Sequence, residues 1–163
     1  MEISDLRERE DLLPTAANRI WKAWWESGGT RYSELEARLR DVVLAGGTTF
    51  SLVAHDGDGF VGTASVIPSD MDERPHYSPW VAAVWIEEHR RGEGHGGRLV
   101  SATISEAYER GARELYLCAR PAMQPFYERL GWTIIEQGVG RDRLSVFRAR
   151  PDGSATGTQA ERA

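Results

Sequence analysis

The stretch Arg90–Val100 reads RRGEGHGGRLV and carries four glycines within six residues before the chain turns apolar. Glycine loses more backbone entropy on folding than any other residue, so such a cluster indicates a need for positive φ or an exposed backbone. The preceding run Trp80–Ile86 is apolar at almost every position, which predicts a strand buried on both faces. After the glycines, Leu99, Thr103 and Ala107 share one helical face. A central strand, a glycine loop and a helix start together indicate an anion-binding cradle.

The first N–H groups of a helix have no partner inside it, and the helix dipole adds partial positive charge there. Where side chains are missing, phosphate oxygens can reach these N–H groups, and an arginine adds a permanent charge. We therefore predict a pyrophosphate site in this loop. Its residues are Arg91, Gly92, Glu93, Gly94, His95, Gly96 and Gly97.

Three phosphate-binding patterns compete for the loop. The P-loop requires Lys-Ser/Thr after its last glycine, and Arg98-Leu99 stands there instead. The dinucleotide pattern GxGxxG matches through Gly92, Gly94 and Gly97. That pattern expects an acidic residue about 20 residues further on, where this chain has Arg120. An NADP-dependent oxidoreductase stays open because arginine can bind a 2′-phosphate, although hairpin-linked strands precede the loop rather than an opening βαβ unit.

The third pattern is Arg-x-x-Gly-x-Gly at Arg91–Gly96, which resembles the acyl-CoA loop of the GNAT superfamily of N-acetyltransferases. The runs Val81–Val100 and Glu114–Trp132 also resemble the core of that superfamily, including FYERLGW at Phe126–Trp132. The resemblance implies a single α/β (α+β) domain over residues 1–150. In this GNAT fold, a mixed, mostly antiparallel sheet of six to seven strands is flanked by about four helices.

Periodicity and turn residues predict the same order of elements without the resemblance. Ser33–Glu36 has the capping-box pattern, and Asp56–Gly59 is a hairpin signal. The small, polar residues 151–163 predict a flexible tail. The predicted elements are a strand at Met1–Leu6, helices at Pro14–Glu26 and from Ser33 to Gly46, hairpin strands at Phe50–His55 and Phe60–Ile67, the strand Trp80–Ile86, a helix ending at Gly111, the strand Glu114–Ala119, the helix Pro121–Leu130, and strands at Trp132–Glu136 and Leu144–Ala149.

The resemblance also implies roles for particular residues. The sheet is expected to open beside its central strand, so that backbone groups of Val84, Trp85 and Ile86 bind the pantetheine arm and the thioester oxygen. Tyr127 matches the general acid that protonates the departing thiolate, and Phe126 beside it is expected to contact the coenzyme. Many relatives have an asparagine after the fifth strand, where this chain has Ala119-Arg120-Pro121-Ala122. We expect Arg120 to reach a coenzyme phosphate in compensation.

The acceptor side carries weaker signals. Glu87, directly after the central strand, is the predicted general base, although a solvated turn is the commoner role of a glutamate there. Asp70, Asp72 and His76 precede the central strand and are expected to rim the pocket for the amine. In the helix Pro14–Glu26, Trp21 and Trp24 are predicted to pack in the core. Trp25 is predicted to line the acceptor pocket.

Composition narrows the function classes. The 163 residues carry 20 Lys+Arg against 25 Asp+Glu, a net charge of −5, which argues against a broad nucleic-acid binder. The single Cys118 allows no intrachain disulfide, and the four scattered histidines show no zinc spacing, so no metal site is predicted. The charged start and the lack of a long apolar run predict neither a signal peptide nor a membrane span, and favour a cytoplasmic protein.

The sequence thus predicts an acetyl-CoA-dependent N-acetyltransferase that acts on a primary amine, preferably of a small molecule. Protein N-terminal or lysine acetylation stays open, and so does a non-catalytic acyl-CoA-binding module. The domain class allows a homodimer, which no residue of this chain specifies.

Overall fold

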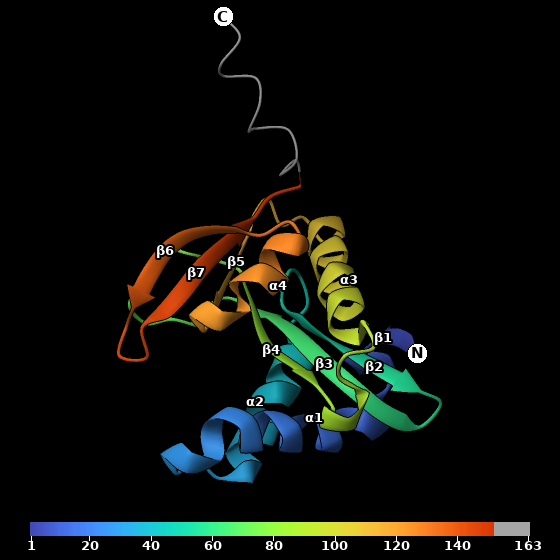
Figure 1. Ribbon diagram of the computed structural model, residues 1–163. Coiled ribbons are helices and arrows are strands. Elements are labelled where there is room, and N and C mark those ends of the chain that lie inside the picture. The colour runs from blue at the N-terminus through green and yellow to red at the C-terminus, as the bar shows by residue number, and fades with distance from the viewer. Residues whose placement is uncertain (152–163) are drawn as a thin grey trace, which may run out of the picture.

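The computed structural model describes residues 1–151, which form one seven-stranded sheet in the order β1-β2-β3-β4-β5-β7-β6 (Figure 1). Neighbouring strands pair antiparallel except β4 and β5, which run parallel. The predicted fold class is therefore confirmed; residues 152–163 of the predicted tail lie outside the described part. The elements are β1 Glu2–Asp5, α1 Leu13–Ile20, α2 Tyr32–Ala45, β2 Phe50–Asp56, β3 Gly59–Ile67, β4 Trp80–Ile86, α3 His95–Glu109, β5 Leu115–Ala119, α4 Gln124–Arg129, β6 Thr133–Val139 and β7 Leu144–Ala149.

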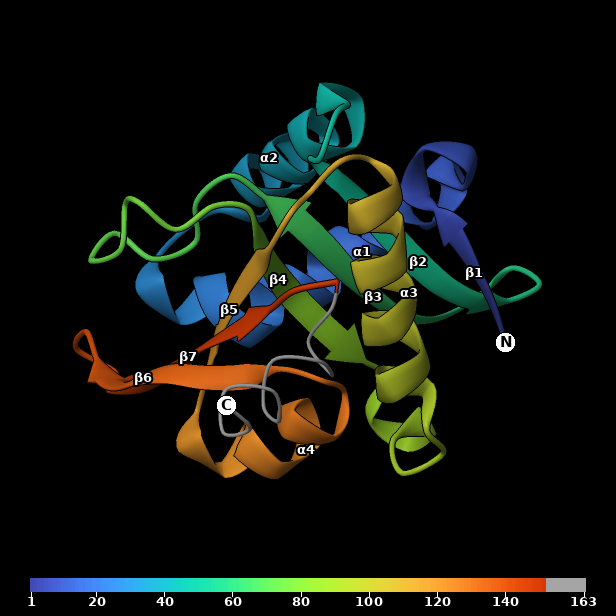
Figure 2. The same cartoon turned by 90° about the horizontal axis from the view of Figure 1, so that it is seen from above.

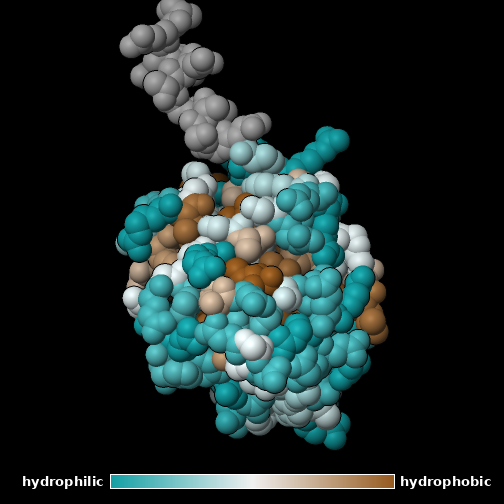
Figure 3. All heavy atoms as spheres, turned by 90° about the vertical axis from the view of Figure 1, so that its right-hand side faces the viewer, coloured by the Kyte–Doolittle hydropathy of each residue, from teal (hydrophilic) through white to brown (hydrophobic). Residues whose placement is uncertain are grey.

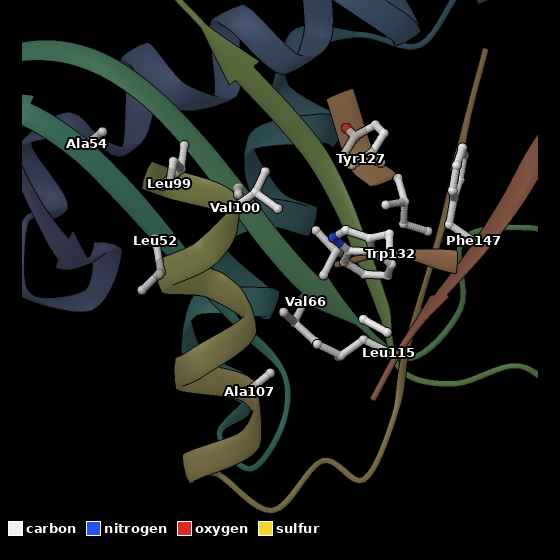
Figure 4. Close-up of a cluster of buried hydrophobic side chains, with 14 of the residues drawn as sticks. Leu52, Ala54, Val66, Leu99, Val100, Ala107, Leu115, Tyr127, Trp132 and Phe147 are labelled. Atoms are coloured by element: carbon white, nitrogen blue, oxygen red, sulfur yellow. The ribbon is translucent and has the colours of Figure 1, made fainter. Parts of the chain in front are cut away.

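Helices cover both faces of the sheet. Helices α3 and α4 lie on one face, and α1 and α2 lie on the other (Figures 1 and 2). The α3 face buries Leu99 and Val100 completely against strand residues, in the cluster that Figure 4 shows. A separate cluster joins α1 and α2 to the opposite face through Leu13 and Leu39. Burial of each such side chain contributes about 1.5–3 kcal/mol, so both layers hold the sheet between them.

The β2–β3 hairpin turns at Asp56–Gly59, as predicted, and its strands bring Gly62 against the end of β4. A Cβ at Gly62 would lie 2.5 Å from both the Trp85 carbonyl oxygen and Ile86 Cδ1. No real side chain is accommodated at that distance. Glycine at this position therefore lets β3 approach the end of β4.

Two local predictions for the first helices are wrong. After α1 ends at Ile20 the backbone widens into a π-helix at Trp21–Trp25, and Trp24 is 50% exposed rather than in the core. Short π-helical segments of this kind are frequent at functional sites.

The capping box predicted at Ser33 does not form. The helix α2 begins at Tyr32, after Arg31, which makes no side-chain capping bond. The Tyr32 hydroxyl donates to the Pro14 carbonyl at 3.1 Å, and its ring meets Trp21 edge to face. These tertiary contacts place the start of α2 ahead of the local capping pattern.

The described residues 1–151 include no helix long and apolar enough to cross a membrane. Within the same range, no group of three His, Cys, Asp or Glu residues is arranged to hold a metal ion. The side of the molecule in Figure 3 is mostly hydrophilic, with hydrophobic residues confined to small areas.

Candidate active site

The sheet opens between β4 and β5. A single residue pair, Trp80↔Tyr116, joins these two strands. Next to this pair, the Tyr116 N–H donates a hydrogen bond to the Pro79 carbonyl at 3.0 Å. Beyond this point the strands separate, as Figure 1 shows. Among residues 1–151, the β5-facing backbone groups over the later part of β4 therefore have no strand partner on that side. This is the opening expected beside the central strand.

A β-bulge shapes the β4 side of the opening. Thr63 pairs with Trp85 and Ser65 pairs with Ala82, so β4 carries one extra residue at this point. Ala83 takes a φ of +54°, which is rare for a residue with a side chain. Such strain persists only where the surrounding fold imposes it, and it is often found at functional sites. No local pattern predicted this bulge, because Ala83 lies in an unbroken apolar run that is typical of a regular strand.

The bulged segment points its side chains to opposite faces of the sheet. Val84 packs against the α3-side core, whereas Trp85 meets Trp24 of the π-helix edge to face at 6.2 Å between ring centroids. Ile86 is buried on the α3 side. The three residues predicted to bind the pantetheine arm therefore anchor β4 with their side chains and leave their main chain at the opening.

The glycine loop leads directly into α3. Gly92 and Gly94 have φ of +79° and +83°, and a Cβ at either position would meet nothing within 4 Å. Gly94 is the N-cap of α3 and offers no side-chain capping bond, so the first N–H groups of the helix stay available. Gly96 packs against the ring of Phe126, whose Cζ would lie 3.5 Å from an added Cβ. The loop thus combines open main chain with a close approach of α4.

The charged side chains of the loop contact one another and the ends of β2 and β4. Arg90 reaches Asp56 at 2.8 Å, and His95 Nε2 lies 2.7 Å from Glu93. Arg91 folds back: its Nε donates to the Ile86 carbonyl at 2.9 Å and its guanidinium stacks 4.6 Å above the Trp85 ring. The Arg91 side chain therefore ties the loop to the end of β4.

Tyr127 comes from α4 on the α3 face of the sheet. Its residue is buried to 5% exposure, and its ring packs against Trp132 and Phe147. In Figure 4 the hydroxyl points away from both of these neighbours. Burial raises the pKa of Tyr127 to about 12. The hydroxyl therefore keeps its proton at neutral pH, as a proton donor must.

Glu87, the predicted base, lies half-buried just after β4. Its carboxylate accepts a short hydrogen bond from the Arg19 guanidinium of α1. This ion pair ties α1 to the end of β4. Glu87 is accordingly already paired with a cation, a contact that the sequence did not predict.

The predicted acceptor residues do not all meet. Asp70 accepts a hydrogen bond from the Cys118 thiol of β5 at 3.4 Å, whereas Asp72 and His76 are exposed along the β3–β4 loop. Trp25 is exposed, and its ring lies under the guanidinium of Arg38, which belongs to α2. Arg120 is exposed immediately after β5. The structure thus brings Asp70 to the β5 arm of the opening and leaves Trp25 with α2.

A second network missed in the sequence fixes the β3–β4 loop. Arg74 binds both carboxylate oxygens of Glu136 on β6, and the Tyr77 hydroxyl donates to the same carboxylate at 2.9 Å. Tyr77 also stacks on Tyr116 with ring centroids 4.4 Å apart. The loop therefore lies along the β6–β7 hairpin, next to the opening. The partners are about 60 residues apart in sequence, as the separation of 62 between Arg74 and Glu136 shows, so no local pattern marks them.

Comparison with known proteins gives evidence of the family that does not depend on the geometry of the site. The acetyltransferase (GNAT) domain family matches residues 47–134, more than half of the chain.

The chain belongs to the GNAT acetyltransferase family.

The matched part of this GNAT domain runs from the turn between α2 and β2 to the start of β6. N-alpha-acetyltransferase 30 of Schizosaccharomyces pombe is 34% identical over 86 residues, which are 51% of this chain and 57% of that protein. The chain therefore spans little more than half the length of this curated relative.

Solved structures share the fold of the GNAT domain. An aminoglycoside 6′-N-acetyltransferase complexed with coenzyme A superposes with a TM-score of 0.70 at 18% identity, over 92% of this chain and 97% of that one. Ribosomal-protein-alanine N-acetyltransferase from Brucella melitensis gives 0.69 at 21% identity, over 92% and 99% of the two chains. At such low identity these neighbours establish the common fold.

Proposed function

We propose that this chain is an N-acetyltransferase that transfers an acetyl group from acetyl-CoA to a primary amine. One observation carries the proposal: the β4–β5 opening lies beside a glycine loop whose helix start is uncapped. Open main-chain N–H groups at a helix start suit a diphosphate, and unpaired strand groups suit an amide-bearing arm. A structural neighbour crystallised with coenzyme A and the family match support the same coenzyme.

In this proposal the chain's own groups have distinct tasks. The N–H groups at Gly92–Gly97 hold the diphosphate, and the main chain of Val84–Ile86 aligns the pantetheine arm. One of those strand N–H groups faces the thioester oxygen and stabilises negative charge on it during attack. Tyr127, protonated at neutral pH, donates its proton to the departing sulfur.

The acceptor is proposed to be a small primary amine. The β3–β4 loop is fixed against β6 by the Arg74–Glu136 pair, which narrows the approach to the opening on that side. An exposed acidic residue at the β5 arm, Asp70, suits a cationic amine. The protein N-terminus is the second candidate, and the similarity to a relative named N-alpha-acetyltransferase 30 favours it.

Calorimetry with acetyl-CoA, followed by thiol release with panels of free amines and short peptides, tests the proposal. We expect saturable acetyl-CoA binding and thiol release that depends on the amine. A preference for free amines supports a small-molecule acceptor, and a preference for peptides supports the N-terminal alternative. Binding without thiol release for any amine would indicate a binding module, and a melting temperature raised by NADPH rather than coenzyme A would contradict the coenzyme.

A further inference from the structure

The proposed reaction requires a group that takes a proton from the amine, since alkyl ammonium ions are protonated at neutral pH. Two acids next to or in the coenzyme loop are already engaged. Glu87 is paired with Arg19, and Glu93 is held by Arg90 and His95. An ammonium group that approached either carboxylate would have to displace the cationic side chain already bound to it.

Asp70 differs from these acids in its surroundings. It lies on the β3–β4 loop and contacts the Cys118 thiol through Oδ2 at 3.4 Å. Within residues 1–151 it forms no ion pair with a lysine, arginine or histidine. The residue remains accessible to solvent, yet the surrounding protein removes enough water to raise the pKa of Asp70 to about 6.

The position of Cys118 places Asp70 relative to Tyr127. Along β5, Leu117 packs in the α3-side core with Tyr127, and Cys118 packs against the opposite cluster with Trp80 and Tyr116. Cys118 lies beyond the last β4–β5 pair, in the part of β5 that has separated from β4. Asp70 and Tyr127 therefore flank the β5 arm of the opening from opposite faces of the sheet.

The titratable groups around this cluster are few. Cys118 of β5 is the group that acts on the Asp70 carboxylate, and its hydrogen bond lowers the pKa of Asp70 against the larger effect of burial. Glu73 on the same loop and Asp70 itself act on Cys118, and burial raises the pKa of the Cys118 thiol to about 12. Cys118 in turn raises the pKa of Tyr127 of α4. Cys118 thus stays a neutral donor, which excludes it as a thiolate nucleophile.

We propose that Asp70 receives the ammonium group of the acceptor and takes its proton, with Cys118 as the positioning residue that orients the Asp70 carboxylate. This inference rests on the proposed acetyl transfer. The acceptor that it selects is a primary amine that is cationic in solution, entering from the face opposite Tyr127.

The reaction begins when one proton passes from R–NH3⁺ to the Asp70 carboxylate, and the nitrogen lone pair then forms the C–N bond. The C–S bond breaks, its electron pair stays on sulfur, and sulfur takes the Tyr127 proton. The nitrogen loses its second proton to water as the amide forms; Asp70 releases its proton to water, and Tyr127 regains one from water.

Steady-state kinetics of Asp70→Asn over pH 5–9 tests this role, with Asp41→Asn, an exposed aspartate of α2 outside the proposed site, as the matched control. For Asp70→Asn we expect kcat/KM for the amine to fall about a hundredfold, the scale of a positioned base, with unchanged acetyl-CoA affinity by calorimetry. The wild-type profile should lose activity below an apparent pKa near 6, and this limb should vanish in Asp70→Asn. Asp41→Asn should behave as the wild type.

Variants of Cys118 test whether it orients the Asp70 carboxylate, because a purely structural role of Cys118 would not shift the acidic limb of the pH profile. Removal of the thiol donor in Cys118→Ala should shift the acidic limb to higher pH, and the stronger hydroxyl donor in Cys118→Ser should shift it to lower pH. Unchanged kcat/KM in Asp70→Asn, or an equal loss in Asp41→Asn, would overturn the assignment while wild-type turnover upholds the proposed function. Acetyl-CoA binding without wild-type turnover of any amine would overturn both.

Discussion

The two sides of the β4–β5 opening are built from different material. On the side proposed to bind the coenzyme, called the coenzyme side below, the site consists of main chain: open glycines at 92 and 94, an uncapped helix start, and strand groups without partners among residues 1–151. On the acceptor side, it consists of side chains from distant segments. Asp70 meets Cys118 across 48 residues, and Arg74 meets Glu136 across 62.

This difference explains why the two sides differ in how they can be changed. Main-chain groups offer the same donors whatever side chain they carry, so the coenzyme side depends on backbone conformation alone. The acceptor side changes with each substitution in the loops that border it. A family can therefore keep one donor while its acceptors differ, in accord with structural neighbours named for an aminoglycoside and for a ribosomal-protein alanine.

The largest effect on kcat is expected at Tyr127, the proposed proton donor to the departing sulfur. Tyr127→Phe should lower kcat about a hundredfold, because a positioned proton donor contributes at least that much, while acetyl-CoA affinity stays unchanged. Tyr108→Phe is the control, since the Tyr108 hydroxyl of α3 is also buried but has no partner among the described residues. Equal kcat for wild type and Tyr127→Phe would remove Tyr127 from the reaction.

The next effect tests the main-chain construction directly. Gly94→Ala places a Cβ in the open space before α3 and strains a φ of +83°, so acetyl-CoA should bind about tenfold more weakly in calorimetry. Gly29→Ala is matched in backbone, with a φ of +85° and an equally open Cβ position.

Both glycine variants should lose a similar free energy of unfolding, about 1 kcal/mol. Only Gly94→Ala should lose coenzyme affinity. If the two variants bound acetyl-CoA equally well, the glycine loop would be a turn without a ligand.

A smaller effect is expected on the acceptor side. Glu136→Gln weakens the bidentate pair with Arg74, so the β3–β4 loop should be held less firmly and KM for the amine should rise about threefold. Glu114→Gln is the control, because Glu114 also accepts from a tyrosine hydroxyl and an arginine, Tyr116 and Arg150, away from the opening. Kinetics at saturating acetyl-CoA measures both; an equal rise would show that the loop does not border the acceptor.

The smallest effect is a pH dependence of stability. The Arg74 guanidinium holds the pKa of Glu136 below its ordinary value. A carboxyl with a lowered folded pKa stabilises the fold above its unfolded pKa and loses this contribution as pH falls through the folded pKa. Urea unfolding should therefore show Glu136→Gln about 0.5 kcal/mol less stable than wild type at pH 7, with the gap closing below about pH 4. A difference in unfolding free energy that persists at low pH would show that it does not arise from ionisation of Glu136.

Much of the architecture followed from local patterns. Alternation and the Asp56–Gly59 turn predicted the β2–β3 hairpin, and the unbroken apolar run Trp80–Ile86 predicted the strand that lies fourth of seven in the sheet. Local patterns failed where tertiary contacts decided. Trp24 left the core because the helix widened at Trp21–Trp25, and α2 started at Tyr32 because of its contacts with α1.

For the candidate site, the sequence alone predicted the glycine loop before α3 and the place of Tyr127 on the helix after β5. Both are contiguous motifs, and the φ of each glycine is a property of its own backbone. Only the tertiary structure decided that Ala83 bulges, that Glu87 is neutralised by Arg19, and that Asp70 stands beside Cys118. These features depend on side chains brought together across many residues by sheet order and loop path, and a single sequence does not encode such pairings locally.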